Sequence, residues 1–219
     1  MGPRQSFHDN LNNLVTDLLI MGDLVEQSIQ KSVTALKNQD LQLANEVIEQ
    51  ELIIDEMELK IEDKCLKLIA MQQPMAKDLR KIATGLKIIT DLERIADHAH
   101  DIAKVAIRLG SEPLIKPLVD IPRMAEKVQL MVKKALDAFV QENIDLALEV
   151  CKDDDEVDSL HNQIFRELLT YMMEDPKNIS QGTQLLFVSS YLERIGDHAT
   201  NLGEWLIYMV TGERKELND

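Results

Sequence analysis

The sequence predicts an all-α fold made of two tandem antiparallel three-helix bundles. Three observations lead to this prediction. Between the breaks in the chain, apolar residues recur at intervals of three and four, which is the period of amphipathic helices. Glycine and proline are scarce, with 8 and 6 residues among 219, and they gather where helices should end. The second half of the chain also repeats the pattern of the first half.

The repeat is clearest in the segment Leu-Glu-Arg-Ile-x-Asp-His-Ala, which occupies Leu92–Ala99 and again Leu192–Ala199, an offset of 100 residues. Further upstream, the stretch that begins at Ala35 aligns with the stretch that begins at Ala138, an offset of 103. The offset therefore falls by three before the repeated motif. We expect the turn between the second and third helices to be three residues shorter in the second copy.

The helices follow in order from these signals. The first is marked by an apolar stripe at Leu11, Leu14, Val15, Leu18, Leu19 and Gly22. In each half the second helix ends near Gln72 or Glu174, and the third carries the repeated motif. The break at Gly110–Pro113 separates the halves, which predicts bundles at residues 1–112 and 113–219. Three amphipathic helices with short connections bury one stripe each in an antiparallel bundle.

Composition narrows the class of protein. A formal net charge of −15 argues against a nucleic-acid partner and against adsorption to anionic lipid. No apolar run approaches the ~18 residues of a membrane span, and the polar amino terminus lacks a signal-peptide core. We therefore expect a cytoplasmic protein without direct membrane insertion. Cys65 and Cys151 stand alone in helical patterns and are interpreted as small core residues.

Acidic residues form columns on the predicted helices. An acid spaced four residues from the next stacks on the same side of a helix, where like charges repel by ~0.2–0.5 kcal/mol per pair. Two columns lie in the repeated motifs, and shorter ones lie on the helices before them. The columns are Glu93, Asp97 and Asp101; Glu193, Asp197 and Asn201; Glu51 and Asp55; and Asp154 and Asp158.

Columns on adjacent antiparallel helices would place four or more carboxylates across one groove. All-oxygen ligation suits Mg²⁺, Mn²⁺ or iron, and a cation would neutralise the repulsion. The alternative is a solvated face on which Arg94 and Arg194 bridge the acids. His98 and His198 point roughly 100° away from the columns and are expected at a flank or an interface. His100 has no counterpart in the second copy and is expected at the surface.

No catalytic constellation is visible in the sequence, so the protein is not expected to be an enzyme. Carboxylate-bridged di-iron bundles rely on Glu-x-x-His, whereas here the Glu-to-His spacing is five. Neither a nucleophile triad nor a nucleotide-binding loop is present. A metal-dependent helical enzyme or metal-storage bundle stays open as an alternative, as does a scaffold whose acids bind nothing.

Several segments of the sequence together carry a family resemblance: "MGDLVEQSI" at Met21–Ile29, "LKNQDLQLANEVIE" at Leu36–Glu49, both Leu-Glu-Arg-Ile-x-Asp segments, and "LLTYMMEDP" at Leu168–Pro176. These segments resemble the PhoU family of phosphate-uptake regulators. The resemblance implies two repeated three-helix bundles whose acid-x-x-x-Asp motifs bind iron, zinc, manganese or magnesium. The implied ligands are the ten column residues named above. Because Asn201 is a neutral donor, the second site is expected to be weaker or more hydrated.

The same resemblance implies what the protein does. It predicts a cytoplasmic, homodimeric negative regulator of phosphate uptake and of the phosphate-starvation regulon. Such a regulator is an adaptor between the ATPase subunit of the phosphate ABC transporter and the sensor histidine kinase of the phosphate two-component system. Composition and spacing alone reach only an acidic helical interaction protein that is competent to bind metal.

Overall fold

The structure, a computed structural model, describes residues 3–214 and is helical throughout, with no strand in that range. The elements are α1 (Pro3–Asn38), α2 (Leu41–Gln72), α3 (Ala76–Leu109), α4 (Asp120–Gln141), α5 (Ile144–Glu174), the 3₁₀ turn η1 (Pro176–Asn178) and α6 (Ile179–Thr211). The predicted all-α fold with three helices in each half is confirmed.

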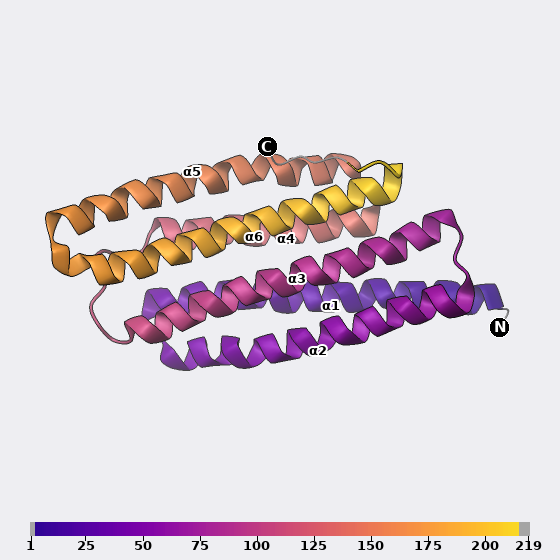
Figure 1. Ribbon diagram of the computed structural model, residues 1–219, viewed down its shortest axis with the longest axis horizontal. Coiled ribbons are helices and arrows are strands. Elements are labelled where there is room, and N and C mark those ends of the chain that lie inside the picture. Colours follow the sequence, from indigo (N-terminus) through magenta and orange to yellow (C-terminus); the bar gives the residue numbers. More distant parts are fainter. Residues whose placement is uncertain (1–2, 215–219) are drawn as a thin grey trace.

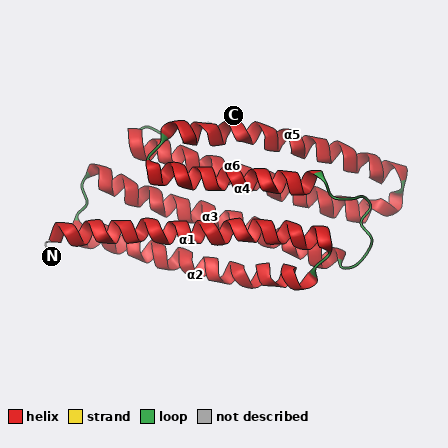
Figure 2. Ribbon diagram, turned by 180° about the vertical axis from the view of Figure 1, so that it is seen from behind, coloured by secondary structure: helices red, strands yellow, loops and turns green. Residues whose placement is uncertain are grey.

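The two bundles lie side by side and share a broad contact layer. Helices α1, α2 and α3 form one bundle, and α4, α5 and α6 form the other. Helix α3 packs along α6, and α1 packs against α4, so these four helices lie between the bundles. Helices α2 and α5 occupy the two outer edges (Figure 1). Seen from behind, α1 and α4 run next to each other across the middle of the molecule (Figure 2).

The second helix of each bundle begins in the same way. Asp40 caps α2, its side chain accepting hydrogen bonds from the backbone N–H groups of Gln42 and Leu43 at 3.0 Å. Asn143 does the same for α5, accepting from Leu146 N–H at 3.2 Å. Such caps satisfy backbone donors that the helix leaves without a partner. The repeat therefore extends to the details of the connections.

The shortening predicted between the second and third helices is divided between a connection and a helix. Three residues, Gln73–Met75, join α2 to α3, whereas Asp175 alone joins α5 to η1. Helix α2 has 32 residues and α5 has 31. The connection thus supplies two of the three missing residues and the helix supplies the third. The predicted boundary between residues 112 and 113 falls inside the connection from α3 to α4, and its position stays a prediction.

The core runs through both bundles without interruption. On α1, Leu11, Leu14 and Leu18 are buried as expected, and the same apolar cluster includes residues from every α-helix. Helices α1 and α4 approach so closely at Gly22 that an added Cβ atom would lie 2.2 Å from Leu136 Cδ1. Among the described helices, none has an apolar stretch long enough to span a membrane.

Candidate functional site

An acidic groove lies between α2 and α3 in the first bundle. Glu51 and Asp55 project from α2 toward Glu93 and Asp97 on α3, and each of the two glutamates is affected by acids of the opposite helix. Burial, and then the charge of Asp97, raises the pKa of Glu93 to about 7. Burial and Asp55 raise the pKa of Glu51 as well. Arg94 compensates only in part, lying 3.4 Å from Glu93 and 3.2 Å from Asp97. The groove therefore carries uncompensated negative charge.

A second groove lies between α5 and α6. Asp154 and Asp158 on α5 face Glu193 and Asp197 on α6. Asp154 is 9% exposed, and burial together with these three acids raises its pKa to about 7. Burial raises the pKa values of Glu193 and Asp197 too. The structure thus brings the predicted acid pairs together in both halves.

A glycine lets Asp154 lie deep in the second groove. A Cβ atom at Gly196 would be 2.7 Å from Asp154 Oδ1 and 3.3 Å from Val157 Cγ1. By the repeat, Gly196 corresponds to Ala96 and Asp154 to the longer Glu51 in the first bundle. The single difference within the eight-residue motif therefore matches a difference in how the two grooves are packed.

The last residue of each predicted column contacts a group other than the four acids of its groove, and its part in cation binding stays a prediction. Asp101 is near Lys104, with its carboxylate 3.3 Å from Nζ. Asn201 turns toward the other bundle and donates to Asp91 on α3 at 3.4 Å. The reason is helical geometry, because a residue eight positions along is rotated by about 80° while one seven positions along returns to within about 20°.

Residues at the seventh position take those places, and the column rule missed them. His100 is seven residues after Glu93, and its Nδ1 lies 3.7 Å from Glu51 Oε1 with the side chain only 15% exposed. The expectation that His100 is a surface residue was wrong. On the facing helices the seventh positions after Glu51 and Asp154 are Glu58 and His161, and both interact electrostatically with groove acids. A search for polar residues spaced at i, i+4 and i+7 would have found His100, Glu58 and His161.

The donors of the grooves suit a cation. Oδ1 of Asp55 is buried without a hydrogen-bond partner, and burial, followed by the charge of neighbouring acids, raises the pKa values of Glu93 and Asp154 to about 7. Within residues 3–214, no three of these side chains converge as the ligands of an ion do. The donor atoms are of the kind that a hard or borderline divalent cation prefers, although the side chains do not converge on one point.

The other two histidines lie between the bundles, as predicted for a flank or interface. His198 Nδ1 lies 2.9 Å from Asp91 Oδ1 across the contact of α6 with α3. The ring of His98 stacks on Tyr191 and also approaches His198, with centroids 5.8 Å apart in each case. Burial, then His198 and Arg194, lowers the pKa of His98 to about 4. This pair therefore belongs to the bundle contact and not to the grooves.

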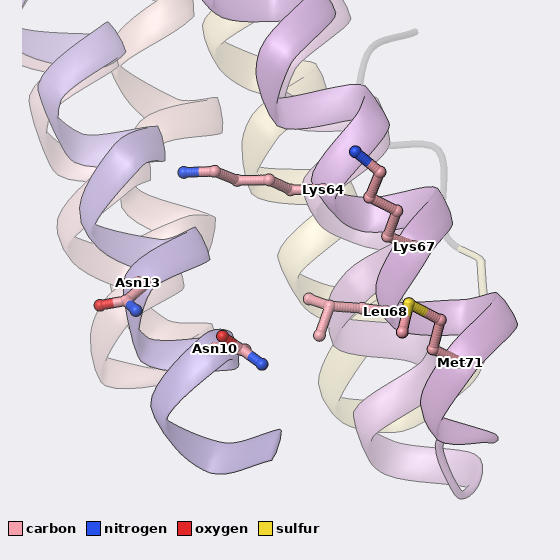
Figure 3. A pocket seen from close by; sticks show the side chains of 6 residues that line it. All are labelled: Asn10, Asn13, Lys64, Lys67, Leu68 and Met71. Atoms are coloured by element: carbon pink, nitrogen blue, oxygen red, sulfur yellow. The ribbon is translucent and has the colours of Figure 1, made fainter. Parts of the chain in front are cut away.

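Neither the cysteines nor the pocket at the end of the first bundle has the features of a catalytic site. Burial raises the pKa of Cys65 to about 12 and that of Cys151 to about 11, so both stay protonated thiols. A pocket of about 280 Å³ lies between the start of α1 and the end of α2 (Figure 3). It is lined by Asn10, Asn13, Lys64, Lys67, Leu68 and Met71.

Comparison with known proteins identifies the family. The PhoU domain family matches the chain twice, at residues 18–106 and 121–206. The chain belongs to the PhoU family. The phosphate-specific transport system accessory protein PhoU homolog of Clostridium acetobutylicum is 49% identical over 217 residues, which is 99% of each chain. The homolog of Rhizobium meliloti is 40% identical over 96% of this chain and 90% of its own.

Solved PhoU structures have the same fold. The crystal structure of PhoU from Pseudomonas aeruginosa matches with a TM-score of 0.90 at 42% identity, covering 94% of this chain and all of that one. That of the phosphate transport system regulatory protein PhoU from Streptococcus pneumoniae matches with a TM-score of 0.89 at 29% identity, covering 96% and 99%. PhoU proteins are accessory and regulatory proteins, a family not known to be enzymes, in agreement with the prediction from the sequence.

Proposed function

We propose that this chain is the accessory protein of a phosphate-specific transport system and restrains phosphate uptake and the phosphate-starvation regulon. Its role is that of a cytoplasmic, metal-binding adaptor between the ATPase subunit of the phosphate ABC transporter and the sensor histidine kinase. The observation that carries the proposal is the PhoU match over both halves of the chain, because relatives that share nearly its whole length are phosphate-transport accessory proteins.

The two grooves support the metal-binding part of the proposal. The first would hold a cation through Glu51, Asp55, Glu93 and Asp97, and the second through Asp154, Asp158, Glu193 and Asp197. A bound divalent ion would supply the positive charge that the buried carboxylates lack. The protein's own contribution is to hold acids on two rigid helices and to limit their solvation, which strengthens their interaction with a cation.

The outer face of α2 supports the adaptor part. Leu52, Leu59 and Leu66, the leucine row, are spaced by seven and are 62%, 64% and 53% exposed. They lie on the side of α2 opposite its buried residues, such as Ile54 and Ile61. An apolar row on an otherwise acidic helix is typical of a protein contact surface. Association into a homodimer is also part of the proposal, and analytical ultracentrifugation tests it.

A deletion strain tests the function. Removing the gene should raise the expression of phosphate-starvation genes in phosphate-rich medium, and the wild-type gene supplied in trans should lower it again. Purified protein should also bind the ATPase subunit and the kinase in pull-down experiments with both partners defined. An unchanged regulon in the deletion strain would count against the regulatory role, whatever the protein binds.

A further inference from the structure

The second groove contains a histidine that the first groove lacks at the same position. Helix α5 brings Asp154, Asp158 and His161 to one face, at positions i, i+4 and i+7. Nδ1 of His161 lies 2.9 Å from the hydroxyl of Ser189, which stands four residues before Glu193 on α6, so the ring lies at the contact between the two helices that carry these acids. The residue that corresponds to His161 in the first bundle is Glu58.

The hydrogen bonds of His161 leave one ring nitrogen available to a ligand. Nδ1 lies 2.9 Å from the hydroxyl of Ser189, a fully buried residue of α6. That hydroxyl is also 3.9 Å from Met124 Sδ, toward which it donates. Because its own proton has a second partner, the hydroxyl is able to accept Nδ1–H from the imidazole. Nε2 then carries the lone pair, which is the tautomer that a metal-ligating histidine needs.

Asp154 independently points to a cation in the same groove. The residue is 9% exposed, forms no ion pair with any described Lys, Arg or His, and lies against the backbone at Gly196. A buried carboxylate that keeps its charge needs a compensating positive group. The cationic residues nearby, Lys127 and Lys134, are paired with its neighbour Asp153 instead.

We propose that Nε2 of His161 is a metal ligand in the second groove, together with Glu193 and Asp158, and that Ser189 positions the ring. This inference rests on the proposed binding of cations by the grooves. Imidazole nitrogen favours zinc, iron, cobalt and nickel, whereas sites built only from carboxylates suit magnesium and manganese. At this position the second groove therefore offers an imidazole donor, which suits a borderline transition-metal ion, where the first groove offers the carboxylate of Glu58. The histidine of the first groove, His100, comes from the opposite helix, and its Nδ1 lies 3.7 Å from Glu51 Oε1.

The test uses the full chain with the first groove disabled by Asp55→Asn and Asp97→Asn, so that only the second groove reports. In this background, Zn²⁺ and Mg²⁺ affinities are measured by calorimetric titration with and without His161→Gln. Removing outer-shell partners of metal ligands costs about 10–100-fold in affinity. We expect Ser189→Ala to lower Zn²⁺ affinity by about 10-fold, and His161→Gln by at least as much. Mg²⁺ affinity should change far less.

A spectroscopic measurement separates ligation from structural damage. In protein labelled with ¹⁵N-histidine, Zn²⁺ should shift the Nε2 resonance of His161, while the exposed His8 stays unshifted and serves as the control. His8→Gln should leave Zn²⁺ affinity unchanged. Zn²⁺ binding that is equal with and without His161, with no shift of its Nε2, overturns this inference and leaves the grooves as cation sites. If neither ion binds any of these proteins, the second groove is no cation site and this inference fails. If the wild type, whose first groove is intact, binds neither ion, the metal-binding part of the proposed function fails as well.

Discussion

The two halves of this chain have the same helices and the same acid pairs, yet their grooves are built differently. In the first groove the corresponding residues are Glu51 and Ala96, and Glu58 adds a further acid. In the second, a shorter Asp154 lies against Gly196, and His161 stands in place of Glu58. The first groove holds more negative charge, whereas the second buries its central acid more deeply. Duplication preserved the scaffold, and substitutions at facing positions made the two sites unequal.

The largest expected effect is the response of stability to divalent ions. At a hundredfold excess over Kd, each filled groove adds about 2.7 kcal/mol to the free energy of unfolding. Mn²⁺ should therefore stabilise the wild type, and chelator should reverse the effect. Asp55→Asn with Asp97→Asn should remove the share of the first groove, and Asp158→Asn with Asp197→Asn that of the second.

Urea denaturation with Mn²⁺ and with chelator measures these shares. With Mg²⁺, the variant Asp158→Asn with Asp197→Asn should lose less of the ion-dependent stabilisation than the first-groove variant, because the second groove has His161 in place of a fifth acid. The neutral Asn201, whose amide donates to Asp91 at 3.4 Å, adds no negative charge to that column either. If all of these proteins respond alike, the acids are a solvated face and bind no cation.

The next effect concerns the glycine of the second motif. Gly196→Ala should destabilise the protein by about 1–3 kcal/mol, because its Cβ would overlap Asp154 Oδ1. The higher helix propensity of alanine offsets up to about 1 kcal/mol of this. In an Asp154→Ala background the overlap disappears, and the same change should become neutral or stabilising. Chemical denaturation of the wild type, the two single variants and the double variant gives the coupling free energy between residues 154 and 196. If the two changes have additive effects on the free energy of unfolding, the packing argument is contradicted.

The reciprocal change in the first bundle provides the control. Ala96→Gly should cost about 1 kcal/mol through helix propensity, because this change removes a methyl group and introduces no atom that could overlap a neighbouring side chain.

A smaller effect is expected from pH in the metal-free protein. The pKa of Asp154 rises from 3.8 to about 7 and that of Glu93 from 4.5 to about 7, in both cases chiefly through burial. Between about pH 4 and 7 the folded protein therefore binds more protons than the unfolded chain. The free energy of unfolding falls as pH rises through this window, by at most about 1.4 kcal/mol per pH unit for each group.

Substitutions assign the two contributions. Asp154→Asn should remove the slope due to the second groove, and Glu93→Gln that due to the first. The measurement is denaturant unfolding in chelator at pH 5, 6 and 7. Stability that rises with pH over this range would show that the groove acids are well solvated.

The smallest effect on stability, within about ±0.5 kcal/mol per residue, is expected on the outer helices. Replacing Leu52, Leu59 and Leu66 by serine should leave the fold intact but abolish binding to the transporter ATPase or the kinase. At the corresponding positions of α5 only Leu169 is apolar, because the other two are Asp155 and Asn162. Leu130→Ser on α4, where the leucine is 46% exposed, is the matched control. Unchanged pull-down of both partners by the triple variant would exclude the leucine row as the contact face.

The fold could be predicted from the sequence because its signals are local. Periodicity, breaks at glycine and proline, and the internal repeat each act within a few turns of helix, and the eight acids from Glu51 to Asp197 that form the grooves were found this way. The other residues beside the grooves could not be predicted in this way, because their positions depend on the rotation of the helix accumulated over two turns. The rule of four placed Asp101 and Asn201 in the grooves, while the period of 3.6 puts His100 and Thr200 nearer to them. The role of Gly196 required knowing which side chain faces it.

The continuous core has a consequence for how the molecule unfolds. A single apolar cluster joins all six helices, and α1 and α4 meet at the close contact of Gly22 with Leu136. The apolar face formed by α1 and α3 is covered by the second bundle, and the face formed by α4 and α6 is covered by the first. Although the chain is a duplication, we therefore expect it to melt as one cooperative unit, with equal calorimetric and van't Hoff enthalpies. An ion that enters one groove stabilises the distant groove's helices too, since both sites draw on the same folding equilibrium.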